Sequence, residues 1–318
     1  MTTQKILVCG ASGFIGRNMI ENLSSLPAFS VHAVYFKSDP IPIKGVTWHR
    51  ADLRDANSLS KLLDNVDIVI QAAATTSGSK DIINKPHMHV TDNAVMNSLL
   101  LRAAFEAKIK HFIFFSCTIM LPSSPKPQKE DDWDINKEIL RPYFGAGWSK
   151  IYIEKMCEFY AHQSTTKFTV IRHSNIYGPH DKFDLDRSHV FGATITKCMT
   201  AKNGEVQVWG DGEETRDFLF VSDLIEFVHL AIAKQPTQFS IFNVGSGTSI
   251  SVKELVESVI SESKKNLSIK FLPNKPTIKS SINLDCDKAR RDLGWRPKTS
   301  LKAGIKKTLA WWVKEYSK

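Results

Sequence analysis

The 318-residue chain has few cysteines and no long apolar run. Its five cysteines are an odd number without metal-site spacing, which argues against a disulfide-stapled secreted domain and a zinc module. No apolar segment reaches the roughly 20 residues that span a bilayer, and the first one, residues 6–9, is too short for a secretion signal. We therefore expect a cytoplasmic protein with reduced thiols, no metal and no membrane contact.

A clustered basic stripe is also missing, although the net charge is +9 from 42 Lys and Arg against 33 Asp and Glu. Proteins that bind nucleic acid usually gather such residues on one face, whereas here they are scattered. The densest run, residues 302–307, falls on an expected C-terminal helix and is typical of a solvated helix face. We expect no nucleic-acid partner, and a mild positive excess suits an enzyme with phosphorylated ligands.

Short apolar runs alternate with helical patterns through the first half of the chain. The expected strands are residues 6–9, 31–36, 46–49, 66–71, 112–115 and 168–171. Unbroken apolar strands with helices between them indicate a parallel sheet covered on both faces. We predict an α/β fold with a Rossmann-type doubly wound sheet in residues 1–177, to which residues 241–260 return. A smaller, mainly substrate-binding lobe would occupy residues 178–318.

A glycine-rich loop, G-A-S-G-F-I-G, joins the first expected strand to the first expected helix. In such a loop the first glycine permits a tight turn and the second lets the backbone approach a pyrophosphate at the helix N-terminus. The third lets helix and strand pack closely. The loop therefore predicts a dinucleotide site. Its residues are Gly10, Ser12, Gly13, Phe14, Ile15 and Gly16.

Two further segments support a dinucleotide. Asp52 and Leu53 follow the strand at residues 46–49, where a carboxylate could accept a hydrogen bond from the adenine amino group or could simply cap a helix. Small residues end the strand at 66–71, where they would let the backbone approach the cofactor, although close packing would also explain them. These residues are Ala72, Ala73 and Ala74.

The end of the second expected strand indicates which cofactor binds. Enzymes that recognise the ribose of NAD usually place an acid there, but this chain has Lys37, and the first acid is Asp39. A lysine could meet the 2′-phosphate of NADP, or it could merely be exposed. We predict NADP, with NAD still possible.

Short motifs along the whole chain match one enzyme superfamily. They include the alanines followed by Gly78, Pro86 and Asn93, the loop S-N-I-Y-G-P-H-D-K-F at 174–183, and residues 188–190, 197, 208–210, 216–219 and 291–297. On these motifs the chain resembles the extended short-chain dehydrogenase/reductase superfamily and, within it, the GDP-L-fucose synthase family. Residues 175–216 are the most specific part of the match.

The resemblance implies an NADP(H)-dependent reductase or epimerase that acts on a GDP-4-keto-6-deoxyhexose. Asn175 would lie near the substrate, and His189 would be the acid/base of an epimerisation step, since histidine exchanges protons near neutral pH. The nucleotide diphosphate would be held by charge-assisted donors and an aromatic ring. These residues are Lys197, Trp209 and Arg216.

The pattern breaks at the catalytic tyrosine. The superfamily's chemistry needs a tyrosine, a lysine four residues later that lowers the tyrosine pKa and binds the nicotinamide ribose, and a serine or threonine. Counting back from Asn175 places the lysine at Lys150 and the tyrosine at position 146, which is Ala146.

The neighbouring positions also depart from the pattern. The serine position falls on Cys117, between Ser116 and Thr118. The cysteine that serves as the second acid of epimerisation in the synthase family would fall on Ile119. No cysteine partner for His189 is therefore visible in the sequence.

Three explanations for Ala146 stay open. Tyr143, seven residues before Lys150, could replace the missing tyrosine if its loop folds back toward the lysine. The sequence could be an inactivated variant in which Ala146 stands for a native tyrosine. Finally, the protein could bind cofactor and sugar nucleotide without the redox step.

Two other functions compete with the reductase. A nucleotide-sugar 4-epimerase or dehydratase would retain NAD, whereas a reductase must exchange its cofactor. A catalytically silent NADP-binding protein is favoured by Ala146, but the phosphate-binding series at 197, 209 and 216 argues against it.

The resemblance further implies a homodimer, because the corresponding helices of the superfamily pair across a two-fold axis. Residues 93–107 and 150–162 carry apolar side chains at helical spacing, which could form that interface or face the sheet. They are Met96, Leu100, Ala104, Ile153, Met156 and Phe159.

Overall fold

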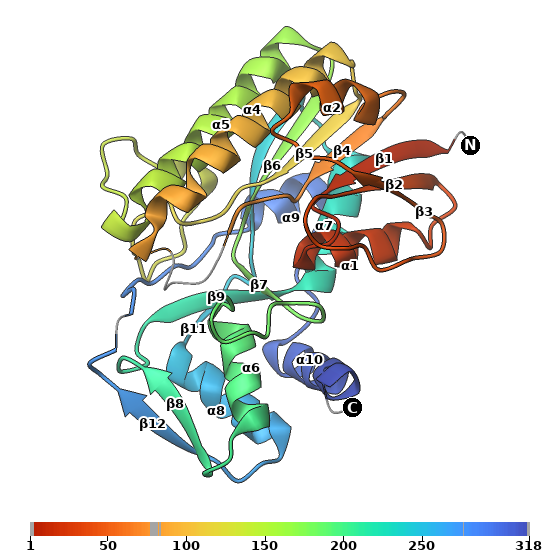
Figure 1. The fold of residues 1–318 in the computed structure, drawn as a ribbon. Helices are drawn as coiled ribbons and strands as arrows, with labels where there is room; N and C mark the ends of the chain where they lie inside the picture. The colour runs from red at the N-terminus through yellow and green to blue at the C-terminus, as the bar shows by residue number, and fades with distance from the viewer. Residues whose placement is uncertain (1–2, 77–81, 83, 276, 317–318) are drawn as a thin grey trace.

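The computed structural model of the protein describes residues 3–76, 82, 84–275 and 277–316 (Figure 1). Gly78 of the sequence motif lies outside these residues. Within the described part of the chain, no helix is long and apolar enough to cross a membrane.

A seven-stranded sheet forms the centre of the larger lobe, with the strand order β10-β6-β5-β4-β1-β2-β3. Every neighbouring pair in it is parallel. The strands are β1 (Gln4–Cys9), β2 (Phe29–Tyr35), β3 (Val46–Arg50), β4 (Ile68–Gln71), β5 (His111–Phe115), β6 (Lys167–His173) and β10 (Phe239–Val244). The order reverses direction at β1, as in doubly wound folds, so the predicted Rossmann-type architecture is confirmed.

Helices cover both faces of this sheet (Figure 1), which explains why the central strands β4 and β5 are buried along their whole length. One face packs against α1 (Phe14–Leu23), α7 (Val221–Lys234) and α9 (Asp287–Leu293). The other packs against α2 (Ala56–Leu62), α4 (Thr91–Glu106) and α5 (Phe144–Gln163). Three short 3-10 turns are η1 (Pro86–His89), η2 (Glu130–Asp132) and η3 (Arg141–Tyr143).

The smaller lobe has its own core and two small sheets. One sheet contains β7 (Asn175–Tyr177), β9 (Thr215–Phe220) and β11 (Ser249–Ser251), and the other contains β8 (Glu205–Trp209) and β12 (Ser268–Leu272). Three helices pack on them, α6 (Val190–Thr200), α8 (Val252–Ser263) and α10 (Leu301–Tyr316). After the first elements of the small lobe, α7, β10 and α9 belong to the larger lobe again. Helix α8 belongs to the small lobe. The division at residue 177 stays a prediction.

The basic run near the C-terminus lies on α10, as the sequence predicts. Lys302 and Lys306 are exposed and each lies 3.5 Å from a carboxylate oxygen of Glu262 on α8. Surface ion pairs of this kind contribute little to stability, so the run is a solvated helix face.

Most of the apolar side chains proposed as a dimer face lie against the central sheet instead. Met96, Leu100, Ala104 and Ile153 are buried against the sheet inside one chain. The prediction that these four side chains form an intersubunit face is therefore wrong, because core-facing and interface-facing helices have the same apolar spacing. Of the proposed residues, Phe159 alone is well exposed among the described side chains.

Candidate active site

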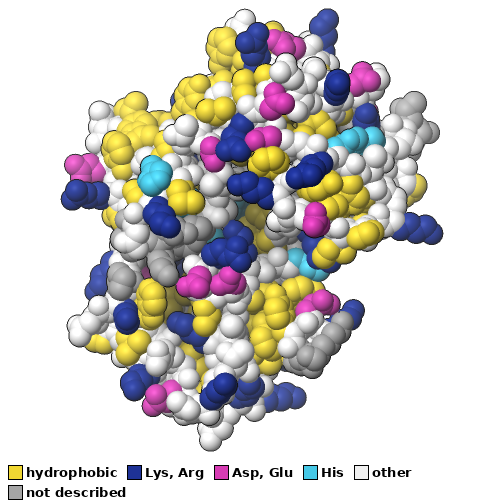
Figure 2. Space-filling model, viewed as in Figure 1, with side chains coloured by type: hydrophobic (Ala, Val, Ile, Leu, Met, Phe, Trp, Pro, Cys, Tyr) yellow, Lys and Arg dark blue, Asp and Glu magenta, His cyan; other side chains and the backbone are white. Residues whose placement is uncertain are grey.

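One cleft of about 1200 Å³ lies between the carboxyl ends of the central strands and the small lobe. Open parallel sheets bind their ligands at this edge. Figure 2 shows Lys and Arg side chains, with Asp and Glu between them, over the junction of the two lobes. Every residue that the sequence nominates for catalysis, cofactor or substrate lines this cleft except Gly16.

The glycine loop fits a dinucleotide pyrophosphate. Gly10 has φ +73°, and a Cβ there would lie 2.6 Å from the Cα of Ala73. A Cβ on Gly16 would lie 2.2 Å from the carbonyl oxygen of Gly10, so Gly16 permits the turn without reaching the cleft. The first turn of α1 has neither a side-chain cap nor an acid. Its N–H groups are therefore open to an anion.

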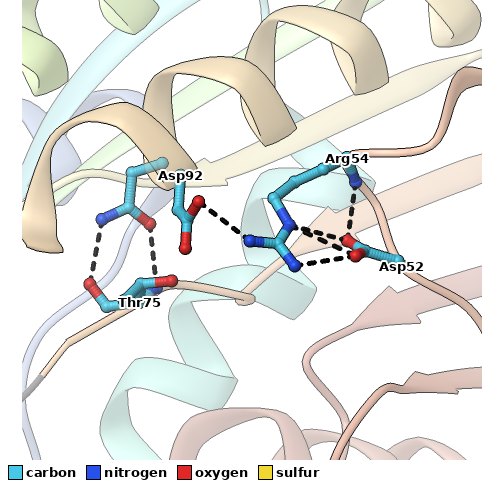
Figure 3. Close-up of polar contacts among 5 residues, drawn as sticks. Asp52, Arg54, Thr75 and Asp92 are labelled. Carbon is cyan, nitrogen blue, oxygen red and sulfur yellow. Dashed lines mark hydrogen bonds and ion pairs between the residues drawn. The ribbon is translucent and has the colours of Figure 1, made fainter.

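Buried amides position the alanine segment beside this loop. The Gln71 side chain accepts a hydrogen bond from the Ala73 amide at 3.2 Å and donates to Asn97 at 2.9 Å. Asn93 accepts from the Thr75 amide and donates to the Thr75 carbonyl, both at 2.9 Å. Figure 3 shows this double contact at Thr75. The segment after β4 is thus held against α4.

At the adenosine end, Arg54 joins two carboxylates (Figure 3). Its Nε and Nη2 donate to Asp52 at 3.0 and 2.8 Å, and its Nη1 donates to Asp92 at 2.9 Å. The Arg54 guanidinium holds the pKa of Asp52 below its usual value. Arg54 and the Lys37 ammonium both lie 5.7 Å from the exposed ring of Phe36.

The sequence analysis missed Arg54. Its nearest clue is the D-L-R run, in which a cation stands two residues after Asp52. Its contact with Asp92 joins residues 38 positions apart, so no local pattern could predict it.

Lys150 lies within α5 and lines the cleft. Its Nζ donates to the Phe115 carbonyl at 2.9 Å and lies 4.7 Å from the Phe114 ring. Burial lowers the pKa of Lys150. Ala146 lies one helical turn earlier and also lines the cleft.

Tyr143 precedes α5, which begins at Phe144, so it does not share a helical face with Lys150. Its ring packs against the apolar cluster that contains Met120 and Ile151. No hydrogen bond joins its hydroxyl to a described residue, and burial raises the pKa of Tyr143. A tyrosine with a raised pKa stays protonated at neutral pH and is a weaker proton donor than an ordinary tyrosine.

The serine region is tied to a buried ion pair. Ser116 Oγ donates to Glu154 at 2.5 Å, and the Glu154 carboxylate accepts from Arg172 at 2.7 Å. Cys117 is half-buried in the cleft wall, and burial raises the pKa of its thiol. Thr118 lies beside it, buried and lining the cleft. The Ser116 hydroxyl is therefore hydrogen-bonded to the Glu154–Arg172 ion pair.

The substrate side is formed by β7 and the start of α6. Asn175 Nδ2 donates to the Asp217 carbonyl at 3.2 Å. Enclosure in the cleft, together with Lys182 and His89, lowers the pKa of His189. His189 is therefore neutral at pH 7 and able to accept a proton.

Asp181, in the loop before α6, is a cleft residue that the sequence analysis did not nominate. Burial raises the pKa of Asp181 to about 7. Its carboxylate accepts from the Lys182 amide at 2.7 Å. Asp181 lies in the G-P-H-D-K-F motif, which could have drawn attention to it, but the motif does not reveal that its carboxylate is buried.

At the far end of the cleft, Trp209 is 38% exposed. Its ring lies 5.9 Å from the Lys197 ammonium and 6.0 Å from that of Lys275. Arg216 donates to the carbonyls of Thr215 at 2.7 Å and Ile278 at 2.9 Å. The end thus offers cations and an open aromatic face, which suit phosphates and a base.

Comparison with known proteins agrees with this geometry. The model of the NAD dependent epimerase/dehydratase family matches residues 6–245. GDP-L-colitose synthase of Yersinia pseudotuberculosis is 26% identical over 315 residues, 98% of both chains. GDP-L-fucose synthase of Sinorhizobium fredii is 28% identical over 312 residues, 96% of this chain and 94% of the relative. A crystal structure of UDP-glucose 4-epimerase from Thermotoga maritima, 26% identical, superposes with a TM-score of 0.87 over 98% and 99% of the two chains.

The chain therefore belongs to the NAD dependent epimerase/dehydratase family. It is an enzyme of the NAD(P)-dependent nucleotide-sugar epimerase and reductase class. The resemblance noted in the sequence is confirmed at this level.

Proposed function

We propose that the protein is an NADP(H)-dependent enzyme that reduces C4 of a GDP-4-keto-6-deoxyhexose, with epimerisation beside the keto group. One observation carries the proposal. A single cleft brings the glycine loop and Lys150 together with Lys197, Trp209 and Arg216, which come from far apart in the sequence. Two relatives named as GDP-sugar synthases align over more than nine-tenths of the chain, which supports the choice of sugar nucleotide.

Each part of the cleft has a role in this proposal. The glycine loop and the Asp52 region bind the cofactor, which when bound supplies hydride to the sugar. Lys150 holds the nicotinamide ribose and stabilises the negative charge that develops on the sugar oxygen, which then takes a proton from water because Ala146 offers no donor. Neutral His189 removes a proton from carbon beside the keto group, where the carbonyl makes that proton acidic. Ile119 can neither give nor take a proton, so in this proposal a water molecule in the cleft returns the proton to the opposite face of the sugar.

The rival with specific support is a 4-epimerase that retains NAD. The UDP-glucose 4-epimerase structure matches nearly the whole chain, which favours it. Mass spectrometry of ligands released from the purified protein separates the two, because an epimerase keeps its cofactor and a reductase exchanges it. Oxidation of NADPH by the protein with a GDP-4-keto-6-deoxyhexose supports our proposal. If the protein instead holds NAD tightly and interconverts sugars that differ at the 4-hydroxyl, it is the 4-epimerase and our proposal is wrong.

We expect NADP to bind more tightly than NAD. Lys37 lines the cleft beside Arg54 and makes no ion pair with a described residue, so its ammonium can meet a 2′-phosphate. Lys37→Ala should weaken NADP binding about tenfold, the scale of one charge-assisted contact, and leave NAD nearly unchanged. Titration of both cofactors measures this. Lys44→Ala removes an exposed charge outside the cleft and is the matched control. Tighter NAD binding by the unmodified chain would contradict the expectation.

We also expect a homodimer through the outer faces of α4 and α5. Val95, Tyr152 and Phe159 are 40–57% exposed there, as single-chain side chains. An isologous contact would bury them. Light scattering at micromolar concentration should give twice the chain mass, and Phe159→Asp should shift it toward the monomer mass. A monomer mass for the unmodified protein would exclude the dimer.

A further inference from the structure

The nucleotide end of the cleft contains a carboxylate that the sequence analysis did not use. Glu214 immediately precedes β9 and lines the cleft. Its Oε2 is buried and has no hydrogen-bond partner among the described residues. The backbone is fixed, because the Glu214 carbonyl accepts from the Val252 amide at 3.0 Å.

Nearby cations do not satisfy this oxygen. The Arg216 guanidinium donates to backbone carbonyls, including that of Ile278 at 2.9 Å. Lys279 pairs with Asp211 at 2.9 Å. A buried carboxylate oxygen without a donor is costly, so a ligand that brings N–H or O–H groups would be favoured at this point of the wall.

Glu214 is also correctly spaced from the phosphate-binding groups. Glu214 stands just before β9 and Arg216 is its second residue, and both line the cleft, so their Cα atoms lie roughly 7 Å apart. Trp209, whose ring is partly exposed, lines the same end. A nucleotide with its diphosphate at Arg216 therefore has its nucleoside within reach of Glu214 and Trp209.

We propose that Glu214 recognises the guanine edge of the bound nucleotide and so selects GDP-sugars. Guanine presents two adjacent donors, N1–H and the 2-amino group, which match the two oxygens of a carboxylate. Uracil and thymine present one N–H between two carbonyl oxygens, which a carboxylate repels. This inference rests on the proposed function, since it requires a sugar nucleotide in the cleft.

Calorimetric titration tests the proposal with four ligands: GDP, IDP, 2′-deoxy-GDP and UDP. IDP lacks only the 2-amino group, and 2′-deoxy-GDP lacks only a ribose hydroxyl. The unmodified protein should bind GDP at least tenfold more tightly than UDP. Glu214→Gln should weaken GDP at least tenfold and remove most of the preference for GDP over IDP. Glu213→Gln makes the same charge change at an exposed neighbour outside the cleft and should leave all four affinities unchanged.

Three results would overturn the inference. If the unmodified and Glu214→Gln proteins bind GDP equally well while Arg216→Ala loses GDP binding, Glu214 does not recognise the base. The proposed function would still stand. If Glu214→Gln abolished only the difference between GDP and 2′-deoxy-GDP, the carboxylate would bind ribose instead of the base. Failure of all four nucleotides to bind the unmodified protein would overturn the proposed function as well.

Discussion

Replacing Lys150 with alanine is expected to lower kcat/KM for sugar reduction by at least ~100-fold, or ~3 kcal/mol in the activation barrier. The Lys150 side chain lines the cleft and has a fixed contact with the Phe115 carbonyl. In our proposal it holds the nicotinamide ribose and stabilises negative charge on the sugar oxygen.

Steady-state oxidation of NADPH measures the Lys150 effect. Lys155→Ala is the matched control, because Lys155 lies on the same helix but is exposed and pairs with Glu158. Thermal unfolding of both variants shows whether the lost Phe115 contact destabilises the fold. A folded Lys150→Ala protein with unchanged kcat/KM would remove Lys150 from the reaction.

Introducing a tyrosine at position 146 is expected to raise turnover by at least ~100-fold, the scale of a positioned proton donor. Ala146 lines the cleft one turn before Lys150, so a phenol there would lie beside the ammonium that lowers its pKa. Tyr143→Phe should change the rate less than threefold in the Ala146→Tyr background, because Tyr143 lies outside the helix.

Turnover assays on a panel of GDP-, UDP- and dTDP-keto-sugars distinguish the explanations for Ala146. If the unmodified chain is already active and Tyr143→Phe abolishes that activity, Tyr143 is the proton donor and our expectation is wrong. If the unmodified, Ala146→Tyr and Tyr143→Phe proteins are equally inert, the silent-binder function is favoured.

The sheet and the cofactor loop could be predicted because their signals are local. Strands buried on both faces must be apolar along their length, and Gly10 is required by backbone conformation alone. Gathering of the predicted residues in one cleft then follows from the rule that parallel strands present their carboxyl ends at one edge.

The parts that sequence could not predict depend on contacts through space. Arg54 needs Asp92 to complete its bridge, and Ser116 is tied to Arg172 through Glu154. Burial of Asp181 and of the Glu214 oxygen depends on tertiary packing, which no local sequence pattern reports. The face of α4 was misjudged because helical spacing does not say which partner covers an apolar stripe.

The interleaving of the lobes has a consequence for synthesis on the ribosome. Helix α1, which presents the glycine loop, packs on β1 and β2 and also on α7, which comes from the second half of the chain. Part of its apolar face therefore stays uncovered until α7 (Val221–Lys234) has emerged, and such surfaces are prone to aggregate. The central sheet itself is complete only when β10 (Phe239–Val244) has been synthesised, so the first half of the chain does not contain the whole nucleotide-binding lobe.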